Sequence, residues 1–289
     1  LSNNLKKFGF SCYGIGRKKS SKTYSKKFGY LKNINGAINS RNLKKLKKIN
    51  FQYIIHCAGG VSPNIGLKKF ISKTTEYEKN VSSILNVLKY FSKGKKKPKV
   101  IFMSSVSVYG NTKSKKIREG HNLKPISNYS ISKIMAEKIC RFFNKKYNID
   151  ILILRGTSLY GPGLKRQVIY DACNKISKNN NIFYGTGREI RDFIHVDDFV
   201  RLIKKIILKS FKGYVIINAG SGKGVSIFKI INYINKKFKK KTSPKFNKFG
   251  NKVNPISLVP SIAKAKKFNW SPKINFYKGL DEYIDWFNK

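Results

Sequence analysis

VIFMSSVSVYG at residues 100–110 and NYSISK at residues 128–133 are the stretches that decide the fold of this chain. The first is an apolar run that ends in small polar residues, which predicts a buried strand ending near Ser105. The second follows a loop containing Pro125 and begins an apolar stretch with helical spacing, which predicts a helix over 128–147. A strand, a loop and a helix in this order form the repeating unit of a parallel sheet covered by helices.

The rest of the chain repeats this alternation, so the expected fold class is α/β with a doubly wound parallel sheet of the Rossmann type. After Gly163 the elements become shorter, and the expected boundary divides the chain into residues 1–163 and 164–289. The expected strands cover 11–17, 51–60, 99–110 and 150–161, and the expected helices cover 41–49, 77–92, 128–147, 166–178, 197–209 and 226–239.

Tyr129 and Lys133 carry the candidate chemistry. Tyr-x-x-x-Lys also occurs at 109/113 and 233/237, but only the pair at 129/133 follows a Ser-bearing strand end and opens a helix. Residues four apart on a helix lie within about 5–6 Å of each other, so the Lys133 ammonium is expected to lower the pKa of the Tyr129 phenol from about 10. Tyr129 would then serve as an acid and base near neutral pH.

Ser105 would hydrogen-bond the same substrate oxygen and orient it for hydride transfer to or from C4 of a nicotinamide. The alternative interpretation is a surface Tyr–Lys pair beside an ordinary serine. His56 and His195 lie in apolar, strand-like contexts, and neither is predicted to be catalytic.

The composition limits the class of protein. With 62 basic and 13 acidic residues the formal net charge is +49, but the lysines are spread through every segment. Biased composition is therefore favoured over a nucleic-acid role, and no nucleic-acid partner is expected. No apolar run reaches 18 residues, no signal-peptide pattern opens the chain, and the four cysteines are scattered. A cytoplasmic protein with no membrane partner and no metal is expected.

In its ordered set of short motifs, the chain resembles the extended short-chain dehydrogenases/reductases of the NAD-dependent epimerase/dehydratase family, in their nucleotide-sugar branch. The resemblance covers essentially the whole chain. It rests on His56-Cys57-Ala58-Gly59, Asn80, Ser105 with Tyr109-Gly110, Tyr129/Lys133, Arg155 with Tyr160-Gly161-Pro162-Gly163, Arg191-Asp192-Phe193 with Asp197-Asp198, Asn218-Ala219-Gly220 and Trp270-Ser271-Pro272.

The resemblance implies an NAD(P)-binding domain over 1–163 and a substrate-binding region over 164–289, with segments that return to the first domain. It implies that Ala58 and Gly59 line the cofactor and that Asn80 supports the catalytic helix, although a structural amide is a comparable alternative for Asn80. Tyr129 and Lys133 would also contact the cofactor.

The same resemblance implies a nucleotide-sugar substrate. Ser158 and Arg191 are the expected substrate contacts, and Arg191 suits a phosphate because guanidinium binds phosphate oxygens bidentately. Asp192 is the expected orienting partner of Arg191, and a structural ion pair of Arg191 with Asp192 or Asp197 is the alternative. A homodimer is compatible with the sequence.

The N-terminus departs from the family pattern. The Gly-x-x-Gly-x-x-Gly turn after a first strand is absent, so we expect the first strand and the Gly-rich loop to be missing from this chain. The next strand ends Gly16-Arg17-Lys18-Lys19-Ser20 with no acidic residue for a ribose 2′-hydroxyl. The cofactor is therefore NADP or NAD, with NADP slightly favoured through Arg17.

Three functions remain open from the sequence. The favoured one is a nucleotide-sugar epimerase or 4-ketoreductase. The others are an NAD(P)-dependent reductase of a non-sugar carbonyl, and a non-catalytic cofactor- or RNA-binding relative. Family dehydratases carry an Asp-Glu pair after the position of Ser105, where this chain has Val106 and Ser107, so dehydratase activity is not expected.

Overall fold

The computed structural model describes residues 1–16, 26, 29–60, 77–112, 114, 116–247 and 255–289. The chain forms two compact units. The first contains Leu1–Ser104, Ile131–Leu154 and Ile203–Ile216, and the second contains Ser105–Ser130, Arg155–Leu202 and Ile217–Lys289. Four elements continue from one unit into the other. They are α7 (Asn128–Tyr147), β5 (Ile151–Gly156), α9 (Val196–Lys209) and β9 (Tyr214–Ala219). The boundary expected after Gly163 stays a prediction.

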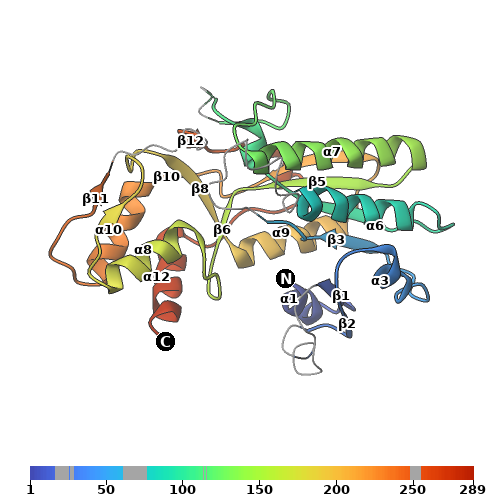
Figure 1. The fold of residues 1–289 in the computed structure, drawn as a ribbon, viewed down its shortest axis with the longest axis horizontal. Helices are drawn as coiled ribbons and strands as arrows, with labels where there is room; N and C mark the ends of the chain where they lie inside the picture. The colour runs from blue at the N-terminus through green and yellow to red at the C-terminus, as the bar shows by residue number, and fades with distance from the viewer. Residues whose placement is uncertain (17–25, 27–28, 61–76, 113, 115, 248–254) are drawn as a thin grey trace. The chain divides into compact units, whose positions relative to one another are not determined.

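The first unit holds the N-terminal elements and most of a sheet (Figure 1). Its remaining elements are α1 (Ser2–Lys7), β1 (Tyr13–Gly16), β2 (Lys32–Asn35), α3 (Ser40–Lys44), β3 (Tyr53–His56), the π-helix η1 (Glu78–Ser82), α6 (Ser83–Phe91) and β4 (Lys99–Ser105). The main sheet has the strand order β3-β4-β5-β9, and β3 pairs with β4 in parallel. β1 and β2 form a separate parallel pair in the described part of the chain.

Helices α6 and α7 pack against β4 and β5 through one apolar cluster. β5 is buried at every position and β4 at most positions, and both strands are largely apolar, as expected for strands covered by helices. The cluster consists of Ile84, Val87, Leu88, Val100, Phe102, Ala136, Cys140, Phe143, Ile149, Ile151 and Ile153. This packing fixes α7 on the sheet, so the residues on its inward face lie against the C-terminal end of β4.

The second unit contains shorter elements, most of which follow Gly163. They are the 3-10 helix η2 (Val106–Tyr109), β6 (Ser158–Tyr160), α8 (Gln167–Ser177), β7 (Ile182–Phe183), β8 (Ile190–His195), β10 (Gly224–Ser226), α10 (Ile227–Lys237), β11 (Lys245–Phe246), β12 (Ser257–Leu258), α11 (Ala263–Lys266) and α12 (Phe276–Phe287). β8 is the centre of its sheet, since it pairs with β6 and β12 in parallel and with β10 in antiparallel.

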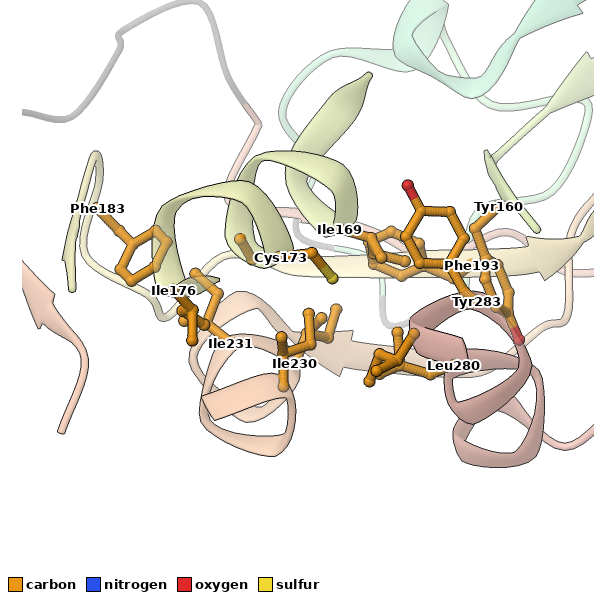
Figure 2. Close-up of a cluster of buried hydrophobic side chains, with 13 residues drawn as sticks. Tyr160, Ile169, Cys173, Ile176, Phe183, Phe193, Ile230, Ile231, Leu280 and Tyr283 are labelled. Carbon is orange, nitrogen blue, oxygen red and sulfur yellow. The ribbon is translucent and has the colours of Figure 1, made fainter. Parts of the chain in front are cut away.

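The core of the second unit lies between α8, α10 and α12. Figure 2 shows Ile169, Cys173 and Ile176 of α8 facing Ile230 and Ile231 of α10, with side chains of α12 beside them. The α8 positions are four and three residues apart, and Ile234 follows Ile230 and Ile231 of α10 by four and three residues, which places each set on one face of its helix. Burying these faces against one another gives the unit its own hydrophobic core.

The structure confirms several predicted elements and divides others. The α7 bounds match the predicted helix at 128–147. The predicted strand at 150–161 is divided into β5 and β6, and the predicted helix at 77–92 begins with the π-helix η1. In the described part of the chain, no helix combines the length and apolar character needed to cross a membrane.

Candidate active site

Ser105 is the last residue of β4, and its side chain caps the helix that follows. The Ser107 backbone N–H donates to Ser105 Oγ at 3.2 Å, which starts η2. Gly110 ends η2 with φ 61°, and a Cβ there would lie 1.6 Å from the Lys124 carbonyl oxygen. Only glycine fits this position, which explains the Tyr-Gly sequence after the strand.

Two serines stabilise the start of α7, because the hydroxyl oxygen of each accepts a hydrogen bond from the backbone N–H of the other. The Ser130 N–H donates to Ser127 Oγ at 3.2 Å, and the Ser127 N–H donates to Ser130 Oγ at 3.1 Å. This reciprocal pair is the capping-box arrangement with serine at both positions. Tyr129 lies in this first turn and is half-buried.

Lys133 is one helical turn after Tyr129, and only 4% of it is exposed. Its Nζ donates to the Met103 carbonyl oxygen at 2.8 Å and lies 5.0 Å from the centre of the Phe102 ring. Burial lowers the pKa of Lys133 to about 8, although electrostatic interactions with Cys57, Glu137 and Cys140 oppose this shift. An ammonium group is thus kept at the C-terminal end of β4, away from water.

The loop after β3 packs tightly against Lys133. Fully buried Asn80 accepts from the Gly60 N–H at 3.2 Å and donates to the Gly60 carbonyl oxygen at 3.0 Å. A Cβ on Gly59 would lie 2.6 Å from Asn80 Oδ1 and 3.1 Å from Lys133 Nζ. Gly59 is exposed on its other side, and Ala58 is half-buried. Because Gly59 has no side chain and is exposed, a ligand can approach its backbone closely, as expected for a dinucleotide.

His56, at the end of β3, is a buried neutral side chain. Its Nε2 lies 3.1 Å from Ser83 Oγ, and its ring centre lies 5.5 Å from that of Phe102. Burial first, and the Lys133 charge second, lower the pKa of His56 to about 3. A neutral imidazole at this position does not compete with Lys133 for an anion.

The other two Tyr-x-x-x-Lys tyrosines have different environments. Tyr109 is buried, donates to Asn218 Oδ1 at 2.7 Å and accepts from Arg155 Nη1 at 2.9 Å. Tyr233 donates to Asp281 Oδ1 at 2.8 Å, and Lys237 forms a salt bridge with the same carboxylate at 2.9 Å. Both phenols are committed to partners within the fold.

Arg191 and Ser158 lie on adjacent strands of the second unit. Ser158 on β6 pairs with Phe193 on β8, two residues after Arg191. Arg191 is half-buried, and its Nη1 donates to the Ile190 carbonyl oxygen at 2.9 Å. Its guanidinium retains donors for a further ligand.

The expectation that Asp192 orients Arg191 is wrong. Neighbours in a strand point to opposite faces, and the Asp192 side chain points toward the turn after β9. It accepts from Gly222 N at 2.6 Å, from Ser221 N at 2.7 Å, from Ser221 Oγ at 2.9 Å and from Thr157 Oγ1 at 3.3 Å. No salt bridge of Arg191 with Asp192 or Asp197 occurs among the described residues.

Sequence reasoning assigned no role to two buried acids, Glu137 and Asp198. Ser104 Oγ donates to Glu137 Oε1 at 2.5 Å, beside the Lys133 contact with Met103. Asp198 accepts from the N–H groups of Lys273 and Ile274 at 3.1 and 3.0 Å, and its side chain also binds Arg201. The spacing Lys133-x-x-x-Glu137 was a usable signal for the first acid, because it continues the Tyr129–Lys133 face. Arg17, the expected NADP contact, lies outside the described residues.

The model of the NAD dependent epimerase/dehydratase family matches residues 1–220, and the chain belongs to this family. It is therefore an enzyme of a family of NAD-dependent epimerases and dehydratases. The predicted family is confirmed.

Individual relatives show the range of reactions in the family. The chain is 29% identical to the UDP-glucuronate 4-epimerase of Thermodesulfobacterium geofontis over 86% of this chain and 77% of that protein. It is 30% identical to the dTDP-4-dehydro-6-deoxyglucose reductase of Escherichia coli over 89% of this chain and 81% of that protein.

A solved structure shows the fold. The UDP-glucuronic acid 4-epimerase of Bacillus cereus, in complex with UDP-glucuronic acid and NAD, matches with a TM-score of 0.85 at 24% identity. The match covers 98% of this chain and 93% of that chain. The predicted Rossmann-type α/β fold is confirmed.

Proposed function

We propose that this enzyme is a nucleotide-sugar 4-epimerase or 4-ketoreductase that uses Ser105, Tyr129 and Lys133 as its acid/base site. The observation that carries the proposal is the buried ammonium of Lys133, one turn after Tyr129 on α7. A buried cation favours a neighbouring phenolate, which is the state of tyrosine that removes a proton near neutral pH.

Ser105, Tyr129 and Lys133 have different roles in the acid/base chemistry of this proposal. Tyr129 takes the proton from the sugar hydroxyl during oxidation and returns it during reduction. Ser105 donates a hydrogen bond to the same oxygen and orients it, and Lys133 stabilises the phenolate of Tyr129. A bound nicotinamide supplies the hydride acceptor and donor. Ala58, Gly59, Asn80, Tyr129 and Lys133 would hold it, and the tight loop after β3 supports this assignment.

The residues after Ser105 argue against dehydratase activity. Eliminating water needs a further acid and base beside the tyrosine. Val106 is apolar and buried, and Ser107 does not transfer protons near neutral pH. Oxidation and reduction at C4 need no such additional acid and base. We therefore propose epimerisation or keto reduction, and not dehydration.

The proposal extends to substrate and cofactor contacts. Arg191 and Ser158 contact the nucleotide sugar, with Arg191 on a phosphate oxygen. The preference for NADP over NAD depends on Arg17, so Arg17→Ala should weaken NADP binding and leave NAD binding unchanged. Isothermal titration with both dinucleotides measures this, and equal binding of both by the wild-type protein would contradict the NADP preference.

A homodimer is the proposed assembly, on the basis of one face of α7. Met135 and Phe142 are seven residues apart on this helix and are 38% and 53% exposed. Apolar side chains at this spacing suit packing against another helix. Sedimentation equilibrium of the wild-type protein and of Phe142→Glu tests this assembly, and a monomeric wild-type protein would contradict it.

A panel of UDP-, GDP-, CDP- and dTDP-hexoses and their 4-keto forms, incubated with the enzyme and each dinucleotide and followed by NMR, tests the reaction. We expect 4-epimers or reduced 4-hydroxyl products. A 4-keto-6-deoxy product would overturn the assignment. Turnover of simple ketones with no turnover of any nucleotide sugar would favour the non-sugar reductase instead.

A further inference from the structure

The buried face of α7 carries a third titratable group, Glu137, after Tyr129 and Lys133. Glu137 follows Lys133 by four residues and Tyr129 by eight, so all three lie along one stripe of the helix. Glu137 is 4% exposed, like Lys133. A carboxylate is rarely buried to this extent without a partner.

Two consecutive residues at the end of β4 bind this stripe. The Met103 carbonyl oxygen accepts from Lys133 Nζ at 2.8 Å, and Ser104 Oγ donates to Glu137 Oε1 at 2.5 Å. The next residue of the strand is Ser105. The position of α7 along β4 is therefore set by a cation contact and an anion contact, directly before the proposed catalytic serine.

The surroundings of Lys133 provide little other negative charge. His56 and Cys57 face it from the end of β3, Asn80 faces it from η1, and Glu137 and Cys140 face it from its own helix. His56 is neutral. Burial raises the pKa of the Cys57 thiol to about 11 and that of the Cys140 thiol well above its usual range, so both thiols stay protonated near neutral pH. Glu137 is the carboxylate of this group.

We propose that Glu137 is a positioning residue whose buried carboxylate keeps Lys133 protonated and held against the end of β4, so that Lys133 remains a cation beside Tyr129. The inference rests on the proposed function for its catalytic consequence. The dependence of the Lys133 charge on Glu137 does not require that function. A buried ammonium loses its proton easily, and a nearby carboxylate opposes that loss.

Lys133 already titrates low, because burial brings its pKa to about 8. Removing the charge of Glu137 should lower this pKa further, by roughly one unit. Less of Lys133 is then charged near neutral pH. The alkaline limb of the kcat/KM profile should accordingly move to lower pH by a similar amount in Glu137→Gln.

The first experiment measures the titration directly. In protein labelled with 13C at the lysine ε carbons, the Lys133 resonance is identified by its loss in Lys133→Met. We expect Glu137→Gln to shift its titration midpoint downward and Glu137→Asp to give an intermediate midpoint. Ser104→Ala removes the hydrogen bond but keeps the charge, so its midpoint should match wild type. Glu282→Gln makes the same charge change at an exposed position and is the matched control.

The second experiment compares kcat/KM profiles of these variants over pH. The proposal is overturned if Glu137→Gln leaves the Lys133 midpoint unchanged, or if Ser104→Ala shifts it equally. If Glu137→Gln does not fold, Glu137→Asp supplies the same comparison. A shifted midpoint in a protein that turns over no nucleotide sugar would support the link between Glu137 and Lys133 and contradict the proposed function.

Discussion

At the scale of single residues, the three Tyr-x-x-x-Lys tyrosines differ in their surroundings. Tyr109 donates to Asn218 and accepts from Arg155, and Tyr233 donates to Asp281. Tyr129 is half-buried in the first turn of α7, one turn before a buried ammonium. Identical residue pairs thus lie in different surroundings, and the proposed acid/base role is assigned to the pair at the start of α7.

Tyr129→Phe should lower turnover by two orders of magnitude or more, because it removes the proposed proton donor and leaves the ring in place. Tyr233→Phe is the matched control, since it makes the same change in a pair engaged with Asp281. Steady-state kinetics with the substrate found by NMR, together with thermal unfolding, separate chemistry from stability. Equal turnover in Tyr129→Phe and Tyr233→Phe would show that Tyr129 is not the acid/base.

Asp192 should make stability depend on pH in the direction opposite to that of a salt-bridged acid. Burial raises the pKa of its carboxyl to about 6, and hydrogen bonds from Ser221, Gly222 and Thr157 oppose the shift. The folded pKa exceeds the unfolded value of about 3.9, so the folded state holds the proton more tightly. The stability that this proton contributes is present below about pH 4 and is lost as pH rises through about 6.

We therefore expect the free energy of unfolding of the wild-type protein to fall by roughly 2 kcal/mol relative to Asp192→Asn between pH 4 and pH 6. Urea denaturation at several pH values measures this difference. Asp285→Asn changes an exposed carboxyl and should parallel wild type. Parallel curves for Asp192→Asn and wild type would mean that Asp192 titrates normally in the folded protein.

Sequence reasoning proposed candidate site residues that lie in local motifs, and it missed contacts between residues that are distant in sequence. Ser105, Tyr129 and Lys133 are recognisable from a strand end and a helix start. Glu137 depends on Ser104, 33 residues away in sequence, and Asp192 depends on Ser221, 29 residues away. The spacing Lys133-x-x-x-Glu137 indicates the helix face of Glu137 but not its partner Ser104, and Asp192 was assigned to its sequence neighbour Arg191 because no short pattern indicates Ser221.

At the scale of elements, α7 is the part of the fold that sequence patterning predicted best. Its apolar residues recur with helical spacing, and serines mark its start. β8, β10 and β12 were not predicted, because strands of two to six residues stabilised by pairing with distant segments carry little periodic signal. The buried face that bears Lys133 packs α7 against the sheet. The first turn of α7 is stabilised instead by the Ser127–Ser130 capping pair.

Ser127→Ala should destabilise the protein by about 1 kcal/mol, because the Ser130 N–H at the start of α7 loses its acceptor. Ser177→Ala is the matched control, since that hydroxyl is exposed and contacts only the Asn174 carbonyl oxygen within its own helix. Chemical denaturation of both variants gives the two free energies of unfolding. Equal stability of both variants would mean that the capping pair does not stabilise α7.

At the scale of the whole molecule, basic residues are spread along the chain, which has a net charge of +49, and several lysines line one groove. A groove of about 1590 Å³ in the first unit is lined by α3, α6, α7 and neighbouring loops. Its lining includes aromatic and aliphatic side chains and no acidic residue. The lysines that line it are Lys44, Lys47, Lys48, Lys89, Lys93, Lys96, Lys138 and Lys146. Grooves of this kind attract polyanions through counterion release, whether or not they have a biological ligand.

If the charge reflects composition alone, binding of RNA should be weak, independent of sequence and steeply sensitive to salt. We expect filter binding of unrelated single-stranded RNAs to lose about 10³-fold or more in affinity between 50 and 200 mM salt, as for any protein that contacts several phosphates. Lys138→Glu with Lys146→Glu in the groove should weaken binding no more than Lys264→Glu with Lys266→Glu at exposed positions in the second unit. A selective loss in the groove variant, together with preference for one RNA, would instead identify a dedicated nucleic-acid site.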